Sequence, residues 1–503
     1  MTSKTMKHTC FALLSVLTVM LSACSVSVDT PQQMNRLPEI YPDYTGVTIP
    51  VNIAPMNFAM ASDAYDMTSV IFKAKDGTEY EAKGDNAIDI DDDDWQELLT
   101  KSQGDSLMVT VRAHHTGNGS DGGNTERWEE FNTFAMYVMP DSIDYSIIYR
   151  LIAPGYQTYS KMGVYQRELS SFDEDANFRN TEISNACVNC HTTCKGDPNT
   201  QSLHIRGKKG GTVIVRNGTM TTYSTKIPDV TVGSAVYPYW HPSANYIAYS
   251  TNNIHQSFYT TPTDLMDTYD IDSDVYVYDI EKNEISRSEA LMDTAYFETN
   301  PAFSPDGKTL YFCRASRKEL PAEVKDVHYD LVKVSFDPQT GAIGTKVDTV
   351  ICASKDSMSV SMPRPSNDGR YIIYCKDRFG GIPVTHHESD LWILDLKTGI
   401  SRCMTEVNSP DYADAFHNWS SNDRWMVFGS RREDGTHTRP FFCYVDKNGM
   451  GRKPFLLPQK DPKNYYAELM LSYNCLEFVK GPCNFDAKEA ASKLVNDENV
   501  QFK

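Results

Sequence analysis

Residues 302–312 read AFSPDGKTLYF, in which a Ser-Pro-Asp-Gly turn leads into a short apolar stretch. Similar phrases occur three more times, as YWHPSANYIAY at 239–249, RPSNDGRYIIY at 364–374 and NWSSNDRWMVF at 418–428. Aligned on residues 241, 304, 366 and 420, they recur after 63, 62 and 54 residues. Each phrase predicts a hairpin turn that enters an alternating strand. This period is in the range of long β-propeller blades.

A second hairpin pattern follows every phrase, for example DVYVYD at 274–279 and DLWILD at 390–395. Two hairpins make a four-stranded blade. The segment GTVIV at 211–215, with Asn217 and Gly218 after it, is typical of the outer hairpin of an earlier blade. We therefore predict a five- or six-bladed β-propeller over residues 201–480, followed by a C-terminal tail at 481–503.

Residues 31–150 carry short alternating strands separated by turn residues, such as SVIFK at 69–73 and MVTV at 108–111. This spacing predicts an N-terminal immunoglobulin-like β-sandwich, so the fold class is mainly β. The run DIDDDD at 89–94 suggests a calcium loop, but it lacks the glycine and the spaced glutamate of an EF-hand. We favour a solvated turn with Asp94 near the N-cap of a helix at 95–101.

The first residues, MTSKTMKHTCFALLSVLTVMLSAC, have a basic start, a short apolar run and a lipobox at Leu21–Cys24. The run is too short for a permanent membrane span, so residues 1–23 are predicted to be a cleaved lipoprotein signal peptide. Cys24 would then be lipidated. Ser25 in place of an aspartate favours the outer membrane, on its periplasmic or cell-surface side. An ordinary secretory signal is the alternative.

The chain is acidic, with a formal net charge of -19 and a pI near 5.1. Nucleic acids and anionic lipid surfaces attract basic faces. We therefore expect no nucleic-acid partner.

A chemical motif lies in the segment 151–200, which we expect to be a linker. Residues 187–191 read CVNCH, and Cys194 follows. In c-type haem attachment, Cys187 and Cys190 would bind the two vinyl groups and His191 would be the proximal iron ligand. The motif predicts one covalent haem c. A zinc site with Cys194 as a third sulfur, an iron–sulfur cluster and a structural disulfide remain alternatives.

The sixth iron position decides between electron transfer and reactivity toward small molecules. His204 is our first candidate for it, so the predicted metal ligands are His191 and His204. Arg206 could pair with a haem propionate. A structural role for His204 is about equally good, and Met220, His241 and His255 are further candidates for the sixth ligand. Separately, Cys475 and Cys483 are the pair that we expect to form a short-loop disulfide.

The four phrases resemble the PD40 repeats of TolB-type propellers. Together with PEIYPDY at 38–44, Gly155-Tyr156, the CVNCH string and LHIR at 203–206, they resemble a lipoprotein family of anaerobic Gram-negative bacteria. Its members are often labelled TolB-like or cytochrome c biosynthesis proteins. One departure occurs at 256–259, where QSFY stands in place of an expected histidine after the Gln-aromatic pair. That position therefore cannot supply a shared axial ligand.

Three function classes follow from these observations. The leading one is an outer-membrane-anchored mono-haem cytochrome lipoprotein, whose propeller docks a redox partner protein in the periplasm. The second is a non-catalytic propeller that binds a peptide or a glycan. Its candidate binding residues lie between predicted strands and are His386, His387, His417, Arg431 and Arg432. The third is a haem peroxidase-like enzyme that uses His204 or Arg206, so the sequence leaves enzymatic activity undecided.

Overall fold

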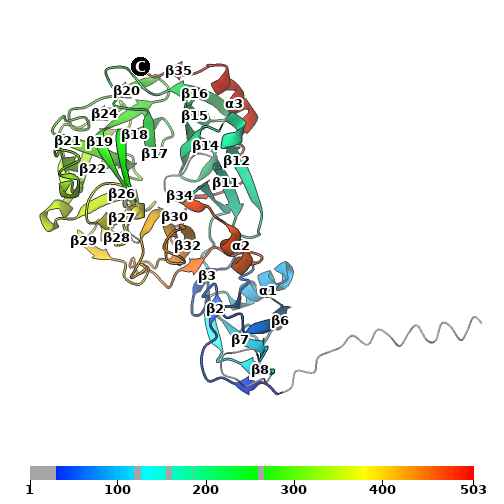
Figure 1. Ribbon diagram of the computed structural model, residues 1–503. Helices are drawn as coiled ribbons and strands as arrows, with labels where there is room; N and C mark the ends of the chain where they lie inside the picture. The colour runs from blue at the N-terminus through cyan, green and yellow to red at the C-terminus, as the bar shows by residue number, and fades with distance from the viewer. Residues whose placement is uncertain (1–29, 86, 118–125, 155–160, 184, 259–265) are drawn as a thin grey trace, which may run out of the picture.

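Six β-sheets of four or five strands surround a common axis and form a β-propeller (Figure 1). The computed structural model describes residues 30–503 except 86, 118–125, 155–160, 184 and 259–265. The predicted signal peptide and Cys24 lie outside the described residues. The mainly β fold and the propeller are thus confirmed, with six blades.

Each blade runs from an innermost strand at the axis to an outermost strand at the rim. In that order, blade 1 consists of β34 (Ser472–Val479), β10 (Ser146–Ile152), β11 (Gly163–Glu168) and β12 (Glu174–Arg179), and blade 2 of β13 (Cys187–Cys194), β14 (Asp197–Arg206), β15 (Gly211–Arg216), β16 (Thr219–Ser224) and β35 (Val500–Gln501). Blade 3 consists of β17 (Ala235–Trp240), β18 (Tyr246–Phe258), β19 (Met266–Asp279) and β20 (Glu284–Ser286), and blade 4 of β21 (Tyr296–Phe303), β22 (Thr309–Ser316) and β23 (Asp330–Asp337), with β24 (Ala342–Ile343) and β25 (Asp348–Ile351) both paired to β23. Blade 5 consists of β26 (Ser359–Pro365), β27 (Tyr371–Asp377), β28 (Asp390–Asp395) and β29 (Ile400–Cys403), and blade 6 of β30 (Asp414–Trp419), β31 (Trp425–Ser430), β32 (Arg439–Tyr444) and β33 (Phe455–Leu456).

The four repeated phrases lie where they were predicted, at the turns between the two inner strands of blades 3 to 6. The glycine-rich hairpin at 211–218 is also confirmed, as β15 and β16. The alternating strands bury one apolar row against each neighbouring blade. Ile214 of blade 2, for instance, packs with Tyr249 and Tyr276 of blade 3.

The ring is closed by a strand from near the end of the chain. β34 pairs antiparallel with β10, so that Ile147 lies opposite Phe478. The propeller therefore begins at about residue 146 rather than 201. Residues 151–200, which we expected to be a linker, form the two outer strands of blade 1, the innermost strand of blade 2 and the start of β14. The expected C-terminal tail contributes helix α3 (Ala487–Val495) and β35, which pairs with β16.

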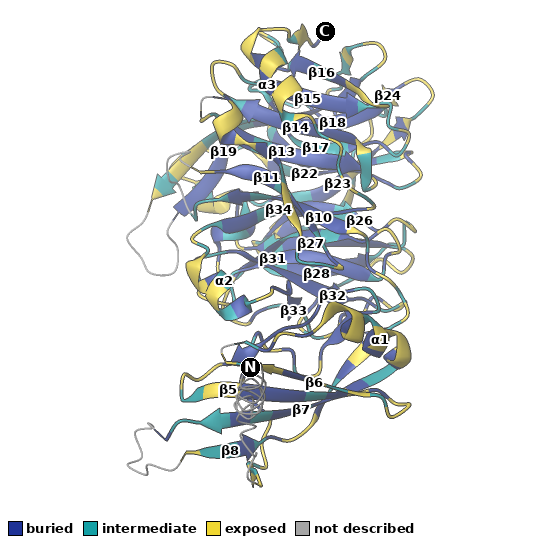
Figure 2. Cartoon of the chain, turned by 90° about the vertical axis from the view of Figure 1, so that its right-hand side faces the viewer, coloured by how far each residue is buried: buried dark blue, intermediate teal, exposed yellow. Residues whose placement is uncertain are grey.

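The details of the expected immunoglobulin-like sandwich are not confirmed. The described strands of the N-terminal part form one seven-stranded sheet and one separate pair, with a helix, α1 (Asp92–Ser102), packed on the sheet (Figures 1 and 2). The sheet strands are β1 (Gln32–Gln33), β3 (Thr48–Pro50), β5 (Tyr65–Lys73), β6 (Glu79–Gly84), β7 (Asp105–His115), β8 (Arg127–Glu130) and β9 (Phe134–Met139), and the pair is β2 (Ile40–Tyr41) with β4 (Ala59–Met60). Trp95 of α1 contacts Phe72 of β5, with 5.8 Å between the ring centroids.

The acidic run before Trp95 starts this helix, as predicted. The capping residue is Asp91 rather than Asp94, because the Asp91 carboxylate accepts hydrogen bonds from the backbone N–H groups of Asp93 and Asp94. The helix also begins three residues earlier than expected. Negative side chains in its first turn interact favourably with the positive end of the helix dipole.

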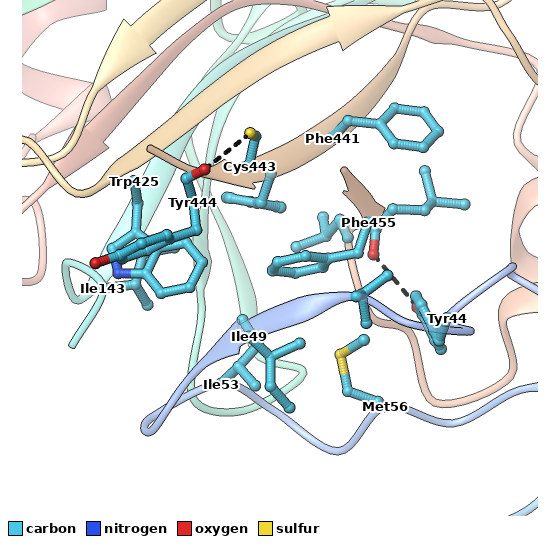
Figure 3. Close-up of a cluster of buried hydrophobic side chains, with 14 of the residues drawn as sticks. Tyr44, Ile49, Ile53, Met56, Ile143, Trp425, Phe441, Cys443, Tyr444 and Phe455 are labelled. Carbon is cyan, nitrogen blue, oxygen red and sulfur yellow. Dashed lines mark hydrogen bonds between the residues drawn. The ribbon is translucent and has the colours of Figure 1, made fainter. Parts of the chain in front are cut away.

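The N-terminal part docks on blade 6 through a continuous apolar core (Figure 3). Ile49, Ile53 and Met56 face Trp425 and Phe455 across this junction. Hydrogen bonds fix its edges. Trp425 Nε1 donates to Asp141 O at 2.8 Å, and Tyr44 Oη donates to Leu456 O at 3.3 Å. The two parts therefore share one buried interface.

Helix α2 (Pro462–Glu468) follows blade 6 and precedes β34. Among the described residues, no helix combines the length and the apolar character needed to cross a membrane.

Candidate functional site: the central channel

Each innermost strand is interrupted at the same level of the propeller. In five of the six, the interruption is a non-glycine residue in the left-handed region of φ. These residues are Tyr237 (φ 47°), Asn300 (φ 51°), Met362 (φ 53°), Phe416 (φ 53°) and Cys475 (φ 53°). The strand register shifts at each of them, which is the mark of a β-bulge.

The sixth innermost strand, β13, has its own register shift between Asn189 and His191. Cys190 is the extra residue there. The pair Cys190-His191 thus takes the place that Tyr237-Pro238 has in blade 3 and Phe416-His417 has in blade 6. The second half of the CVNCH string is therefore one member of a ring of six bulges, which we call the bulge ring.

The bulge ring surrounds the deep part of the central channel. Cys190, Tyr237, Asn300, Met362, Phe416 and Cys475 all line it. The space that the centres of water molecules can reach is about 50 Å³. Because one water needs about 10–15 Å³ on this measure, the deep channel has room for a few waters.

The side chains of the motif are buried, with exposed fractions of 6% for Cys187, 7% for Cys190 and 5% for His191. Burial, with the positive charge of Arg150, lowers the pKa of His191 to about 4, so its imidazole is neutral at pH 7. The backbones of Ile148 and Cys475 lie beside the ring. Neither ring nitrogen makes a well-formed hydrogen bond to a described residue.

The structure does not bring His191 and His204 together. Directly opposite residues of paired strands project on the same face of a sheet. His191 lies opposite Leu203, and His204 lies opposite Asn189. The two histidines therefore project from opposite faces of blade 2, with the sheet between them. His204 Nδ1 instead lies 2.9 Å from the Thr212 hydroxyl, and burial lowers the pKa of His204 to about 3.

The other candidates for iron ligation or haem contact are also elsewhere. Met220 is on β16, three strands outward from β13, or about 14 Å at the usual strand spacing. His241 has the structural role that its turn position suggested, since Nε2 lies 3.0 Å from Gly307 O and Nδ1 lies 2.7 Å from the Ser243 hydroxyl. His255 is exposed near the end of β18, and Arg206 ends β14 opposite Cys187.

As folded, these residues do not fit a haem c. Cys187 and Cys190 are three residues apart. In a helical turn residues with this spacing lie on the same side, but in a strand such as β13 they are separated by about 10 Å. Cys190 Sγ accepts a hydrogen bond from Tyr237 N of blade 3, at 3.4 Å, whereas His191 lies toward blade 1. A porphyrin bound to this string would have to open both blade interfaces. Covalent haem stays a prediction of the motif, and the strand geometry argues against it.

The predicted disulfide is not present, and the alternative of a disulfide within the CVNCH string is not supported either. Cys475 and Cys483 are both free thiols. Cys475 is in the bulge ring, whereas Cys483 lies beyond the end of β34 and packs against the apolar core between blades 1 and 2. A bridge between Cys187 and Cys190 is excluded by the strand, because disulfides need a Cα separation of less than about 7 Å. Among the described residues, no cluster of His, Cys, Asp and Glu has the arrangement of a metal site.

Above the bulge ring, on the side of the repeated turns, the channel widens into a second cavity, which we call the channel mouth. All six blades contribute to it, through Glu477, Thr192, Tyr239, Phe303, Arg364 and Trp419 in blade order. On the same measure it holds about 100 Å³. Most of these positions follow the bulge by two residues, so the bulge ring sets which side chains enter the channel mouth.

Arg364 lies at the boundary and lines both the channel mouth and the deep channel. Its guanidinium stacks over Tyr239 at 5.5 Å from the ring centroid, and Nη1 donates to Pro363 O at 3.1 Å. Glu477, also at the boundary, accepts a hydrogen bond from Thr193 N at 2.9 Å. Burial raises the pKa of Glu477 above its ordinary value.

Of the residues predicted to form a binding face, most lie away from the channel mouth. His386 is buried between Asp377, at 2.6 Å, and Asp267, at 3.1 Å. Arg432 pairs with Asp414 at 3.0 Å. His417 alone lines the channel, in the bulge ring. Arg364 was missed, although it starts the third repeated phrase, where the other phrases have an uncharged residue.

Comparison with known proteins adds little beyond the fold. No family model matches the chain. Over 176 residues it is 27% identical to dipeptidyl-peptidase 5 of Porphyromonas gingivalis, a match that covers 35% of this chain and 21% of that protein. The chain thus spans about a fifth of the length of this relative.

Among solved structures, TolB from Acinetobacter baumannii has a TM-score of 0.40 at 13% identity, over 77% of this chain and 85% of that one. Porphyromonas gingivalis dipeptidyl peptidase 4 has a TM-score of 0.30 at 9% identity, over 72% and 59% respectively. At these values the likenesses carry no argument about activity or ligand. We therefore argue function from the channel itself.

Proposed function

We propose that this protein is a binding propeller of the cell envelope, held at the outer membrane by a lipid on Cys24, and that its channel mouth receives a peptide segment of a partner protein. The supporting observation is the convergence of all six blades on one cavity at the propeller axis. Binding sites are concave and combine apolar surface with placed polar groups, and the channel mouth presents both aromatic and polar side chains.

The walls and the floor of the channel mouth have different chemistry. Tyr239, Phe303 and Trp419 supply aromatic surface, and Arg364 and Glu477 supply charge at the base. An extended peptide suits such a site, because aromatic rings bury large apolar areas and the charged groups fix direction and register. This function needs no cofactor, and electron transfer through a haem would be a separate property.

The test is a screen of a random-peptide library against the immobilised chain from residue 30 onward. Peptides that depend on the channel should lose binding to Asn418→Trp, because Asn418 lines the channel mouth and the indole would fill it. Gln339→Trp is the matched control, since Gln339 is exposed in the turn between β23 and β24. If every enriched peptide binds wild type and Asn418→Trp equally, the proposed function is wrong.

A further inference from the structure

We propose that the channel mouth is selective for a carboxylate, carried by the C-terminus or an acidic side chain of the bound peptide, and that Arg364 is the group that recognises it. This inference rests on the proposed function and names the chemical class that the same site takes. Three observations carry it, namely the free donors of Arg364, the excess of cations in the channel mouth and the prior engagement of its carboxylates.

Arg364 forms no direct ion pair with a described residue, although it lies near enough to Glu477 to offset part of the rise that burial causes in the pKa of that carboxyl. Among the described residues, no carboxylate oxygen lies within 4 Å of its guanidinium nitrogens, although most other partly buried arginines of the propeller, such as Arg314 and Arg432, have such a partner. Its single protein acceptor is the carbonyl of Pro363, and Tyr239 covers one face of the group. A guanidinium has five N–H donors in a planar fork that matches a carboxylate. Several of these donors therefore remain for a ligand.

Two further cations stand at the rim. Lys195 and Lys480 line the channel mouth, and neither forms an ion pair with a described residue. They are held next to each other because Lys480 N donates to Gly196 O at 2.9 Å. In a chain with a formal net charge of -19, three cations against two carboxylates, Asp144 and Glu477, leave this cavity with a small positive excess. Such an excess raises the local concentration of anions and guides them inward.

The carboxylates of the channel mouth are already engaged by the protein. Asp144 accepts hydrogen bonds from the backbone N–H and the hydroxyl of Ser421, at 2.7 and 2.6 Å. Glu477 accepts from Thr193 N at 2.9 Å. These bonds hold both acidic groups in place. Neither carboxylate forms a direct ion pair with Arg364, Lys195 or Lys480, so the three cations remain open to an anionic ligand.

The experiment uses three small probes and ligand-observed NMR titration. The probes are N-acetylphenylalanine, its amide, and N-acetyl-aspartyl-phenylalanine amide, which carries its carboxylate on a side chain. We expect the first to bind at least tenfold more tightly than the amide, because a hydrogen bond to a charged group contributes more than a neutral one. Comparison of the first and third probes separates a C-terminal from a side-chain carboxylate.

Arg364→Gln should reduce the preference for acid over amide to less than threefold, whereas Arg364→Lys should keep part of it. Lys333→Gln is the charge control, because Lys333 is exposed on β23. Thermal melting checks that each variant is folded. For the wild type, raising the salt concentration should weaken the acid probe and leave the amide unchanged.

Equal binding of the amide and of both carboxylate probes by the wild type overturns the inference, whatever the library screen gives. An acid preference that survives in Arg364→Gln overturns the assignment to Arg364. If instead the library screen finds no peptide that depends on the channel while the acid probe binds through Arg364, the peptide function fails and the carboxylate site remains.

Discussion

His386 Nε2 lies 3.1 Å from Asp267 Oδ1, and this contact joins blade 5 to the β18–β19 hairpin of blade 3, at the end where Asp267 pairs with Ser257. On its other side, His386 Nδ1 lies 2.6 Å from Asp377 Oδ2. Burial opposes the charged imidazolium, but the two carboxylates outweigh burial and raise the pKa of His386 to about 10. The imidazolium therefore holds two non-adjacent blades together at neutral pH.

The first prediction concerns this contact. His386→Asn should lower the free energy of unfolding by about 3–5 kcal/mol at pH 7, because it leaves buried carboxylates without their counter-charge. Since the pKa is raised above its ordinary value near 6.5, the stabilisation is complete below that pH and is lost as the pH rises to about 10. Urea unfolding at pH 6, 8 and 10.5 measures it.

The gap between wild type and His386→Asn should therefore shrink steadily from pH 6.5 to 10. His437→Asn is the control, because among the described residues His437 pairs with one carboxylate, Asp434, within its own loop and joins no two blades. A gap that stays constant over this pH range would contradict the charged state that we assign to His386.

The second prediction concerns the CVNCH string. Expressed in a host that matures c-type cytochromes, the chain should give no haem-stained band on a denaturing gel, because β13 separates Cys187 from Cys190 and buries His191 between blades. A cytochrome c made in the same host is the positive control. A stained band that disappears in Cys190→Ala would restore the prediction of the motif and would require β13 to leave its blade.

The third prediction concerns the anchor, which lies before the described residues. Cys24→Ser should move the protein from the membrane fraction to the soluble fraction, since the cysteine of the predicted lipobox would be the acyl acceptor. Cys10→Ser, in the predicted signal peptide, is the control and should leave the fractionation unchanged. Membrane association of Cys24→Ser in high salt would show attachment by another route.

The fourth prediction concerns the junction of Figure 3. Phe455 is 1% exposed and contacts Phe442, with 5.5 Å between the ring centroids. Phe455→Ala should cost about 3–5 kcal/mol and should split a single thermal transition into two, as the N-terminal part separates from blade 6. Calorimetry measures both effects. Ile400→Ala, at an exposed position of β29, should change neither.

The sequence predicted blades 3 to 6 well because each carries its own turn phrase, and the phrase is a local signal. Blade 1 was missed because its partner strands, β10 and β34, are more than 300 residues apart, and no local pattern reports such a pairing. Blade 2 was recognised only by its outer hairpin. The inner hairpin of blade 2 turns at Lys195-Gly196 and lacks the repeated turn phrase of blades 3 to 6. Its cysteines suggested haem attachment rather than a strand.

The candidate site was predicted less well than the fold. The string Cys187-x-x-Cys-His was interpreted in isolation, although the next blades offer the comparison Tyr237-Pro238, Asn300-Pro301 and Phe416-His417 at equivalent positions. Arg364 could have been found by asking which phrase starts with a charge. The absence of a direct ion pair to Arg364 among the described residues could not be predicted, because it depends on the distances between six blades.

The closure of the ring by β34 sets the order in which the chain would finish folding after the predicted export. A protein that crosses a membrane N-terminus first delivers β10 long before residues 472–479 arrive, so β10 waits as an open edge with unpaired N–H and C=O groups. The N-terminal part lacks its docking surface for nearly as long, since blade 6 is also made late. A chain stopped short of residue 472 is therefore a ring with a gap, and the channel exists only in the completed molecule.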